Sequence, residues 1–251
     1  MSLLSVNGLN LWYGNNHILH HISFSVEKGE ILCIVGESGS GKSSILYSIL
    51  GLLPPRSKVE GSIVFKGIEL LRLSEKERKS IRGRHIGMIF QEPSSYLDPL
   101  FTVGSQISEA FISHYPKKKE EARTKTLEAM RKAGIPQPEE KFSMYPHQLS
   151  GGLKQRVCIA SAIVCEPELI LADEPTTALD VTVQKRILNL FRKFKKEGKS
   201  VILVTHDFGV VAEVGDRVIV LREGRVIEEG DVFEIFDRPK ESYTRSLLEA
   251  I

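Results

Sequence analysis

The chain has 251 residues, of which 41% are hydrophobic and 26% charged, and its formal net charge at pH 7 is +2. This composition is ordinary for a globular protein of one large domain or two small ones, and the charge argues neither for nor against nucleic acid as a partner. No stretch approaches about 18 consecutive apolar residues and no hydrophobic signal segment opens the chain, which excludes a bilayer-spanning helix and a secretory signal. The sequence therefore predicts a cytosolic or peripheral protein.

Three cysteines, Cys33, Cys158 and Cys165, lie in apolar stretches without the spacing of metal ligands. We interpret them as small core side chains in a reducing compartment. Because they are not clustered, we expect no iron–sulfur cluster on this chain.

The N-terminal part of the chain predicts two kinds of strand. Residues 2–30 alternate apolar and polar side chains in short runs, which is typical of antiparallel strands. The pentapeptide 31–35 is entirely apolar, as expected for a central parallel strand that is buried on both faces. Residues 44–50 have apolar side chains at helical spacing, so the glycine-rich segment 36–43 lies between a buried strand and a helix.

The segment 36–43 fits the phosphate-binding pattern G-x-x-x-x-G-K-S/T. Its glycines let backbone N–H groups surround phosphate oxygens, and the N-terminus of the following helix adds partial positive charge. In this pattern Lys42 reaches the β- and γ-phosphates and the Ser43 hydroxyl ligates Mg²⁺. The alternative is an ordinary glycine-rich turn between a strand and a helix. The expected nucleotide-binding residues are Gly36, Glu37, Ser38, Gly39, Ser40, Gly41, Lys42, Ser43 and Ser44.

Two further strands and a surface helix are expected before residue 92. Segment 61–67 has the alternation of a strand, and segment 74–84 is charged enough to be a short surface helix. The apolar segment 86–90 is a second buried strand, and it ends at Gln91.

From about residue 92 to residue 148 the sequence predicts a helical insertion in the α/β core. Prolines bracket this stretch, and segment 120–133 has one apolar face at helical spacing. Ser150 can cap the next helix, which is expected at 153–165.

The C-terminal part alternates buried strands with a helix and ends in a hairpin. A third buried strand runs over 169–172 and ends at Asp173-Glu174, and a helix follows over 183–194. A fourth buried strand, 201–205, ends at His206. A hairpin of strands 217–221 and 225–229 is expected around Glu223-Gly224.

Each buried strand thus ends at a residue that can take part in phosphate chemistry. Open parallel sheets bind ligands at the carboxyl ends of their strands, so these side chains are expected to meet at one edge. There Asp173 is expected to hold Mg²⁺, Glu174 to accept a proton from water, and Gln91 to offer its amide oxygen to Mg²⁺ or water. His206 can donate a hydrogen bond to the γ-phosphate. Taken singly, His206 is better explained as a structural histidine and Gln91 as a polar strand end, but their shared placement at strand ends favours the functional roles.

Further segments resemble the ATP-binding-cassette (ABC) ATPases, and the match extends from about Leu3 to the C-terminus. Leu149-Ser150-Gly151-Gly152 resembles the family signature, although Leu153 stands where many members have glutamine. Ala178-Leu179-Asp180 resembles the loop that touches the partner ATPase, and His206 matches the family's switch histidine. Tyr13 stands where the family places an aromatic ring under adenine, and the alternative is a core aromatic of a strand.

The resemblance is closest to the peptide and nickel importer branch of that family. It rests on the segments 98–104, 145–148, 173–184, 205–207, 210–213 and 243–248. Many oligopeptide and dipeptide members continue into a cysteine-rich extension for an iron–sulfur cluster, which residues up to Ile251 do not contain. The transported substrate, peptide or nickel, stays open at this point.

The resemblance implies an α/β fold with a P-loop NTPase core, a parallel central sheet, an N-terminal antiparallel β layer and an inserted helical subdomain. A single ATPase domain is expected over 1–251, with the helical subdomain at about 92–165. The implied activity is Mg²⁺-dependent ATP hydrolysis that is coupled to import, with ATP and Mg²⁺ as cofactors. Ser43, Gln91 and Asp173 are the implied metal ligands, and Glu174, His206 and Gln91 the implied catalytic residues.

The resemblance also implies partners on both sides of a membrane. They are a second ABC ATPase, two integral membrane permease subunits and an extracytoplasmic substrate-binding protein, with this chain on the cytoplasmic face and no nucleic acid bound. In the ATPase dimer, Ser150, Gly151, Gly152 and Asp180 are expected to act in trans on the partner's nucleotide. A membrane-subunit helix is expected to dock near residues 91–106.

Two alternatives belong to other functional classes. A soluble cassette ATPase that acts on nucleic acid or ribosomes usually has two fused cassettes or a long coiled-coil insertion, and this chain shows one phosphate loop and no heptads. A nucleotide-sensing module without hydrolysis is disfavoured because Glu174 is present.

Overall fold

The computed structural model describes residues 2–177 and 179–249 and has a mixed α/β fold. Its contacts divide the chain into two units. The first unit combines Met1–Arg78 with Phe194–Ile251, and the second is Lys79–Lys193. The second unit contains the segment 92–165 that the sequence predicts as a helical subdomain, together with two strands.

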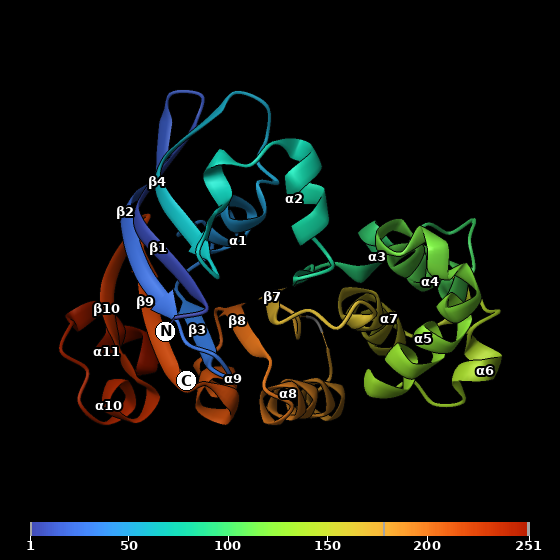
Figure 1. The fold of residues 1–251 in the computed structure, drawn as a ribbon. Helices are drawn as coiled ribbons and strands as arrows, with labels where there is room; N and C mark the ends of the chain where they lie inside the picture. Colours follow the sequence, from blue (N-terminus) through green and yellow to red (C-terminus); the bar gives the residue numbers. More distant parts are fainter. Residues whose placement is uncertain (1, 178, 250–251) are drawn as a thin grey trace. The chain divides into compact units, whose positions relative to one another are not determined.

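The first unit contains an antiparallel sheet built from the alternating N-terminal segments, with strand order β2-β1-β4-β5. It is drawn in blue to cyan in Figure 1. The predicted strand at 61–67 begins earlier, because β4 pairs with β1 from Leu4 opposite Phe65 to Tyr13 opposite Ser57, with a register shift between Asn7 and Asn10. The strands are β1 Leu4–Tyr13, β2 Asn16–Val26, β4 Ser57–Phe65 and β5 Ile68–Glu69.

Parallel strands form the other layer of the first unit, in the order β10-β9-β3-β8. β3 pairs in parallel with both β8 and β9, and β10 returns antiparallel to β9 as the predicted hairpin. Every residue of β3 and β8 is buried, which explains why these segments are continuous apolar runs rather than alternating ones. The strands are β3 Ile31–Val35, β8 Ser200–Thr205, β9 Arg217–Arg222 and β10 Arg225–Asp231.

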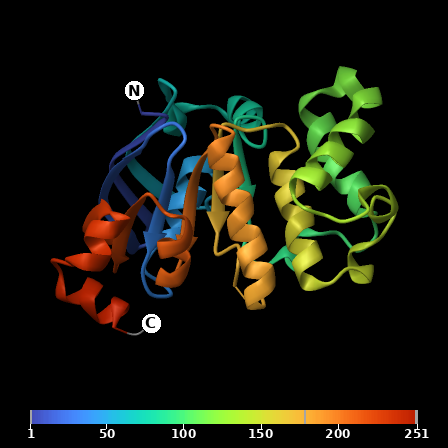
Figure 2. The ribbon, with the colours of Figure 1, turned by 90° about the horizontal axis from the view of Figure 1, so that it is seen from below.

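The helices of the first unit are short. α1 follows the glycine-rich segment as predicted, whereas the three helices after residue 207 are absent from the sequence-based prediction. Each has six or seven residues, too few for a clear helical periodicity. Figures 1 and 2 both show α10 and α11, in red, beside each other near the C-terminus. The helices are α1 Lys42–Leu50, α9 Phe208–Val214, α10 Val232–Asp237 and α11 Ser242–Leu248, with the 3-10 helix Leu70–Arg72.

The second unit packs helices beside a pair of parallel strands, β6 Ile86–Ile89 and β7 Leu169–Asp173. The helical segment expected between residues 92 and 148 is confirmed, and α4, α5 and α7 pack against one another (Figure 1). The helices are α3 Pro93–Tyr96, α4 Val103–His114, α5 Lys119–Lys132, α6 Pro138–Lys141 and α7 Gly151–Ile163, with 3-10 turns Pro116–Lys118 and Pro146–Gln148. Two helices cross a boundary between the units, α2 Glu75–Ile81 and α8 Val181–Lys196.

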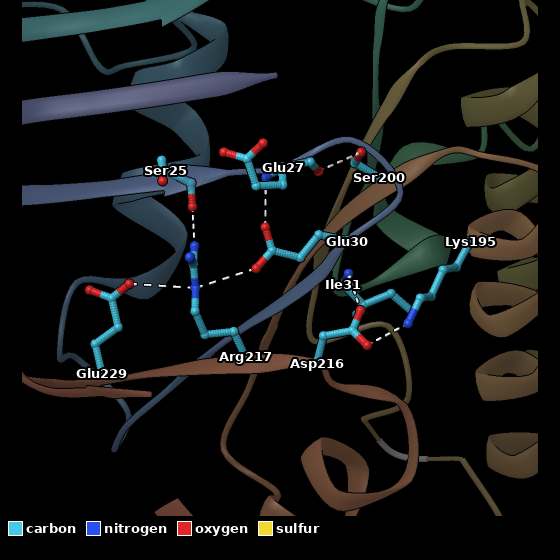
Figure 3. A network of polar contacts seen from close by, with 9 residues as sticks. All are labelled: Ser25, Glu27, Glu30, Ile31, Lys195, Ser200, Asp216, Arg217 and Glu229. Atoms are coloured by element: carbon cyan, nitrogen blue, oxygen red, sulfur yellow. Dashed lines mark hydrogen bonds and ion pairs between the residues drawn. The ribbon is translucent and has the colours of Figure 1, made fainter. Parts of the chain in front are cut away.

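The amino ends of β3, β8 and β9 are joined by a network of polar and charged groups in the first unit (Figure 3). The Asp216 carboxylate accepts a hydrogen bond from the buried N–H of Ile31 at 2.9 Å and contacts the Lys195 ammonium. The Arg217 guanidinium pairs with Glu30 at 3.3 Å and with Glu229 at 3.5 Å. Partial burial raises the pKa of Glu30 despite the nearby guanidinium. The network fixes the turn through which the chain enters the central strand.

We expect Asp216→Ala to lower the free energy of unfolding by about 1–3 kcal/mol, because it leaves the buried Ile31 N–H without its side-chain acceptor. Urea unfolding measures this change. Asp237→Ala, which removes an exposed carboxylate at the end of α10, is the matched control and should have a far smaller effect. Equal destabilisation by the two variants would contradict a structural role for Asp216.

Among the residues that the structure describes, no helix has both the length and the apolar character needed to cross a membrane.

Candidate functional site

The predicted phosphate loop lies between β3 and α1 and requires glycine at both of its ends. A Cβ atom on Gly36 would lie 2.1 Å from the carbonyl oxygen of Leu221, so no larger residue fits there. Gly41 precedes α1 with a φ of 101°, and a Cβ atom on it would lie 2.7 Å from Leu19. The loop is therefore packed closely against β9 and β2, and its backbone conformation depends on these glycines.

The ammonium group of Lys42 is held over the loop. Lys42 is 5% exposed, and its Nζ donates to the carbonyl oxygens of Gly36 at 2.8 Å and Glu37 at 2.9 Å. Ser40 has a buried hydroxyl without a hydrogen-bond partner among the described residues. A buried cation, an orphaned hydroxyl and the N-terminus of α1 together suit a phosphate group, so the residues present fit the predicted nucleotide.

His206 follows the strand that neighbours the one leading into the phosphate loop. Val35, the last residue of β3, pairs with Thr205, the last residue of β8. Gly36 and His206 therefore emerge at the same edge of the first unit's parallel strands, as the sequence predicts for these two residues. His206 is exposed, and the next residue, Asp207, caps α9 by accepting from Gly209 N at 2.7 Å.

Tyr13 ends β1 and is connected to the helix that follows the phosphate loop. Its hydroxyl donates a hydrogen bond to the Ser44 Oγ at 3.1 Å. The residue is half-buried and is not among the buried core side chains. A partly exposed ring beside α1 suits the predicted contact with a nucleotide base better than the alternative of a core aromatic.

In the second unit, Gln91 and Glu174 are brought together by the register of their strands. Ile89 of β6 pairs with Ala172 of β7. Gln91 lies two positions after Ile89, and Glu174 lies two positions after Ala172. The Gln91 amide donates to the Glu174 carboxylate at 3.2 Å. Thr177, which the sequence analysis missed, donates to the same carboxylate oxygen at 2.9 Å.

Glu174 also has an unusual backbone. Its φ of 42° lies in the left-handed region that residues other than glycine rarely adopt. Such outliers concentrate at functional sites, where the surrounding structure imposes them. The preceding residue, Asp173, is 1% exposed at the end of β7, as expected for a carboxylate that is delivered by a buried strand.

Ser150 occupies the N-cap position of α7, but its side chain makes no capping hydrogen bond. The predicted position before the helix is confirmed and the capping role is wrong, because the exposed side chain accepts no hydrogen bond from the helix backbone. A Cβ atom on Gly151 would meet open space, whereas one on Gly152 would lie 2.8 Å from Val183 of α8. At the start of α7, the Ser150 hydroxyl makes no capping hydrogen bond, and open space lies beside Gly151.

The loop before α8 contains Asp180, whose carboxylate accepts from the backbone N–H of Val183 at 2.9 Å. This contact gives Asp180 a structural role as a helix cap, in addition to the role in trans that the resemblance implies. Ala178, in the same motif, lies outside the described residues.

The prediction that the cysteines are core side chains is confirmed for two of the three. Cys33 and Cys158 are buried and Cys165 is half-buried. Burial raises the pKa of the Cys158 thiol to about 12 and that of Cys165 to about 11, so neither is a reactive thiolate at neutral pH. In the described parts of the chain, no group of three or more histidine, cysteine or acidic side chains is arranged to hold a metal ion.

Comparisons with known proteins identify the family of the chain. The profile of the ABC transporter family matches residues 19–177. The dipeptide transport ATP-binding protein DppD of Bacillus subtilis is 48% identical over 256 residues, which cover 99% of this chain and 76% of DppD. The oligopeptide transport ATP-binding protein OppD of the same organism is 47% identical over 238 residues, which cover 94% of this chain and 66% of OppD.

Solved structures show the same fold. The dimeric structure of MJ0796, a bacterial ABC transporter cassette, aligns with a TM-score of 0.81 and 34% identity over 91% of this chain and 98% of that one. The CbiO1 protein of Clostridium perfringens, part of the transporter complex CbiONQ, aligns with a TM-score of 0.81 and 32% identity over 94% of this chain and 91% of its own. The chain therefore belongs to the ABC transporter family and is an ATP-binding subunit that hydrolyses ATP.

Proposed function

We propose that this chain is the ATPase subunit of an importer for short peptides, working at the cytoplasmic face of a membrane. The observation that carries the proposal is the 48% identity to a dipeptide transport ATP-binding protein over 99% of the chain. The oligopeptide relative supports the same substrate class, so peptides are favoured over nickel complexes. The proposed partners are a second cassette, two membrane permease subunits and an extracytoplasmic substrate-binding protein.

ATP is proposed to bind at the phosphate loop of the first unit. Backbone N–H groups of residues 36–44 would contact its phosphates, and Lys42 would exchange the carbonyl oxygens of Gly36 and Glu37 for phosphate oxygens. Tyr13 would stack on the adenine base. Ser43, Gln91 and Asp173 would hold Mg²⁺, which supplies charge neutralisation at the phosphates.

Glu174 is proposed as the general base and His206 as a hydrogen-bond donor to the γ-phosphate. The contacts of Gln91 and Thr177 to a single oxygen of Glu174 support the first role, since they orient the carboxylate. A carboxylate so oriented can accept a proton from a water molecule beside it. His206 emerges at the same strand edge as the phosphate loop, which supports the second role.

The signature residues are proposed to act on the nucleotide of a second cassette. Ser150 has an exposed hydroxyl that is not used in capping α7, and Gly151 is uncovered, so both are available to another molecule. Gly152 and Asp180 both lie beside Val183, since a Cβ atom on Gly152 would lie 2.8 Å from its side chain and Asp180 accepts from its backbone N–H. The related cassette MJ0796 is described as dimeric, which supports such a pairing.

Affinity purification of the tagged chain from detergent-solubilised membranes tests the importer proposal. We expect an integral membrane complex to co-purify, and a dipeptide with its binding protein to stimulate ATP turnover when that complex is placed in vesicles. Nickel ions serve as the competing substrate in the same assay. Co-purification with ribosomes, RNA or DNA in place of membrane proteins would overturn the proposal in favour of the soluble alternative.

A further inference from the structure

The C-terminal helix α11 places one side chain on the phosphate loop. Tyr243 is 8% exposed, and its hydroxyl accepts a hydrogen bond from the backbone N–H of Glu37 at 3.4 Å. The two residues are 206 positions apart in the sequence. Both belong to the first unit, and α11 is the short red helix beside α10 in Figure 1.

The Tyr243 hydroxyl contacts the Gly36–Glu37 peptide group, which also accepts a hydrogen bond from Lys42. The N–H of Glu37 and the C=O of Gly36 belong to one planar peptide unit. That C=O accepts from Lys42 Nζ at 2.8 Å, while the N–H donates to the Tyr243 hydroxyl. The orientation of this peptide is therefore fixed from one side by the lysine and from the other by the tyrosine.

Tyr243 is itself held by contacts on α11 and β9. The Arg222 guanidinium lies 4.7 Å from the centroid of its ring. The start of α11 is fixed by Glu228, a buried carboxylate that accepts from the backbone N–H groups of Lys240 at 2.8 Å and Glu241 at 3.2 Å. Burial raises the pKa of Tyr243, so the phenol is neutral at physiological pH and keeps its hydroxyl proton.

We propose that Tyr243 is a positioning residue of the nucleotide site, which sets ATP affinity by fixing the Gly36–Glu37 peptide before ATP binds. The proposal rests on the role assigned above to the phosphate loop. A loop whose N–H groups already point correctly loses less conformational freedom on binding, so its ligand binds more tightly. When Lys42 leaves the Gly36 carbonyl for a phosphate, the contact with Tyr243 still restrains this peptide.

Tyr243→Phe tests the proposal because it keeps the buried ring and its contact with Arg222 and removes only the hydroxyl. Given the ordinary strength of one hydrogen bond, we expect ATP affinity to fall about threefold to tenfold. In the assembled transporter the KM for ATP should rise by the same factor with kcat unchanged, because Tyr243 does not touch the reacting atoms. ATP affinity is measured by isothermal titration calorimetry, below the unfolding temperature of each variant.

Two further variants separate the possible explanations. Tyr115→Phe is the matched control, since that tyrosine also lies under an arginine, Arg84 at 5.4 Å, but belongs to the second unit. Lys42→Ala tests the phosphate loop itself and should weaken ATP binding on the order of 10- to 100-fold, as loss of a charged hydrogen-bond donor does.

The measured affinities test the role of Tyr243 separately from the assignment of the phosphate loop. Weaker ATP binding by Tyr243→Phe, with Tyr115→Phe at the wild-type value, supports the inference. Unchanged affinity in Tyr243→Phe beside a large loss in Lys42→Ala overturns the inference and leaves the phosphate loop in place. Unchanged affinity in Lys42→Ala would instead overturn the assignment of the loop. A fall in kcat with KM constant would show that Tyr243 does not act through ATP affinity.

Discussion

Glu174→Gln is expected to lower ATP turnover by about 10²–10⁴ while ATP affinity stays within a few-fold of the wild type. The amide is nearly isosteric with the carboxylate, and its oxygen can still accept the hydrogen bonds from Gln91 and Thr177. What the substitution removes is the ability to take a proton from water. The geometry of the site is thus preserved and its proposed base is lost.

Turnover in the assembled complex and ATP affinity of the isolated chain are measured in parallel. Glu109→Gln, which makes the same chemical change at an exposed position of α4, is the control and should leave both values unchanged. ATP should also hold the Glu174→Gln protein as a closed dimer, because the step that opens it is blocked, and this is visible as a doubled mass in light scattering. A Glu174→Gln protein with wild-type turnover would assign the base to another residue.

The strands could be predicted because burial dictates their composition. β3 and β8 are buried at every residue, and only continuous apolar segments satisfy that environment. The short helices α9 and α11 were not predicted, since seven residues give less than two full turns of periodicity. The start of α9 does have a local signal in Asp207, an N-cap residue type that caps this helix.

The site was predictable where its residues follow buried strands. Gln91 and Glu174 meet because Ile89 and Ala172 are in register, and the strand ends alone indicated this. The contacts that other segments make with the phosphate loop could not be predicted from strand ends. Gly224 donates to the Ser40 carbonyl oxygen at 2.9 Å, and this contact depends on how the β9–β10 turn approaches β2 and the loop.

Tyr243 is a clearer example of a contact that the sequence does not predict. Its hydroxyl contacts a residue 206 positions away, through a helix that the sequence did not reveal. The segment 243–248 resembles the peptide and nickel importer branch, but nothing in its composition points to the nucleotide site. Contacts between distant segments are set by tertiary packing, and local pattern does not encode them.

Ser150→Arg is expected to abolish ATP-driven dimerisation and most ATP turnover, while ATP binding to the isolated monomer stays within a few-fold of the wild type. The phosphate loop and Ser150 each precede a helix, so each offers N–H donors and a positive helix end to an anion. Lys42 is already engaged with its own loop, and the Ser150 hydroxyl does not cap its own helix. Two cassettes that pair with two-fold symmetry would use both anion sites, because each nucleotide is then shared between a loop and a signature.

An arginine at position 150 would block this pairing by its bulk, and it leaves every residue of the ATP-binding loop unchanged. Ser113→Arg adds the same side chain to an exposed position of α4 and should leave dimerisation intact. Mixed with Lys42→Ala protein, the Ser150→Arg chain should recover at most one working site per dimer, since only one of the two shared sites then combines an intact loop with an intact signature. Calorimetry of the monomer and ATP-dependent mass are measured side by side. If Ser150→Arg removes monomer affinity as Lys42→Ala does, Ser150 acts on the nucleotide of its own chain, and the shared-nucleotide mechanism is wrong.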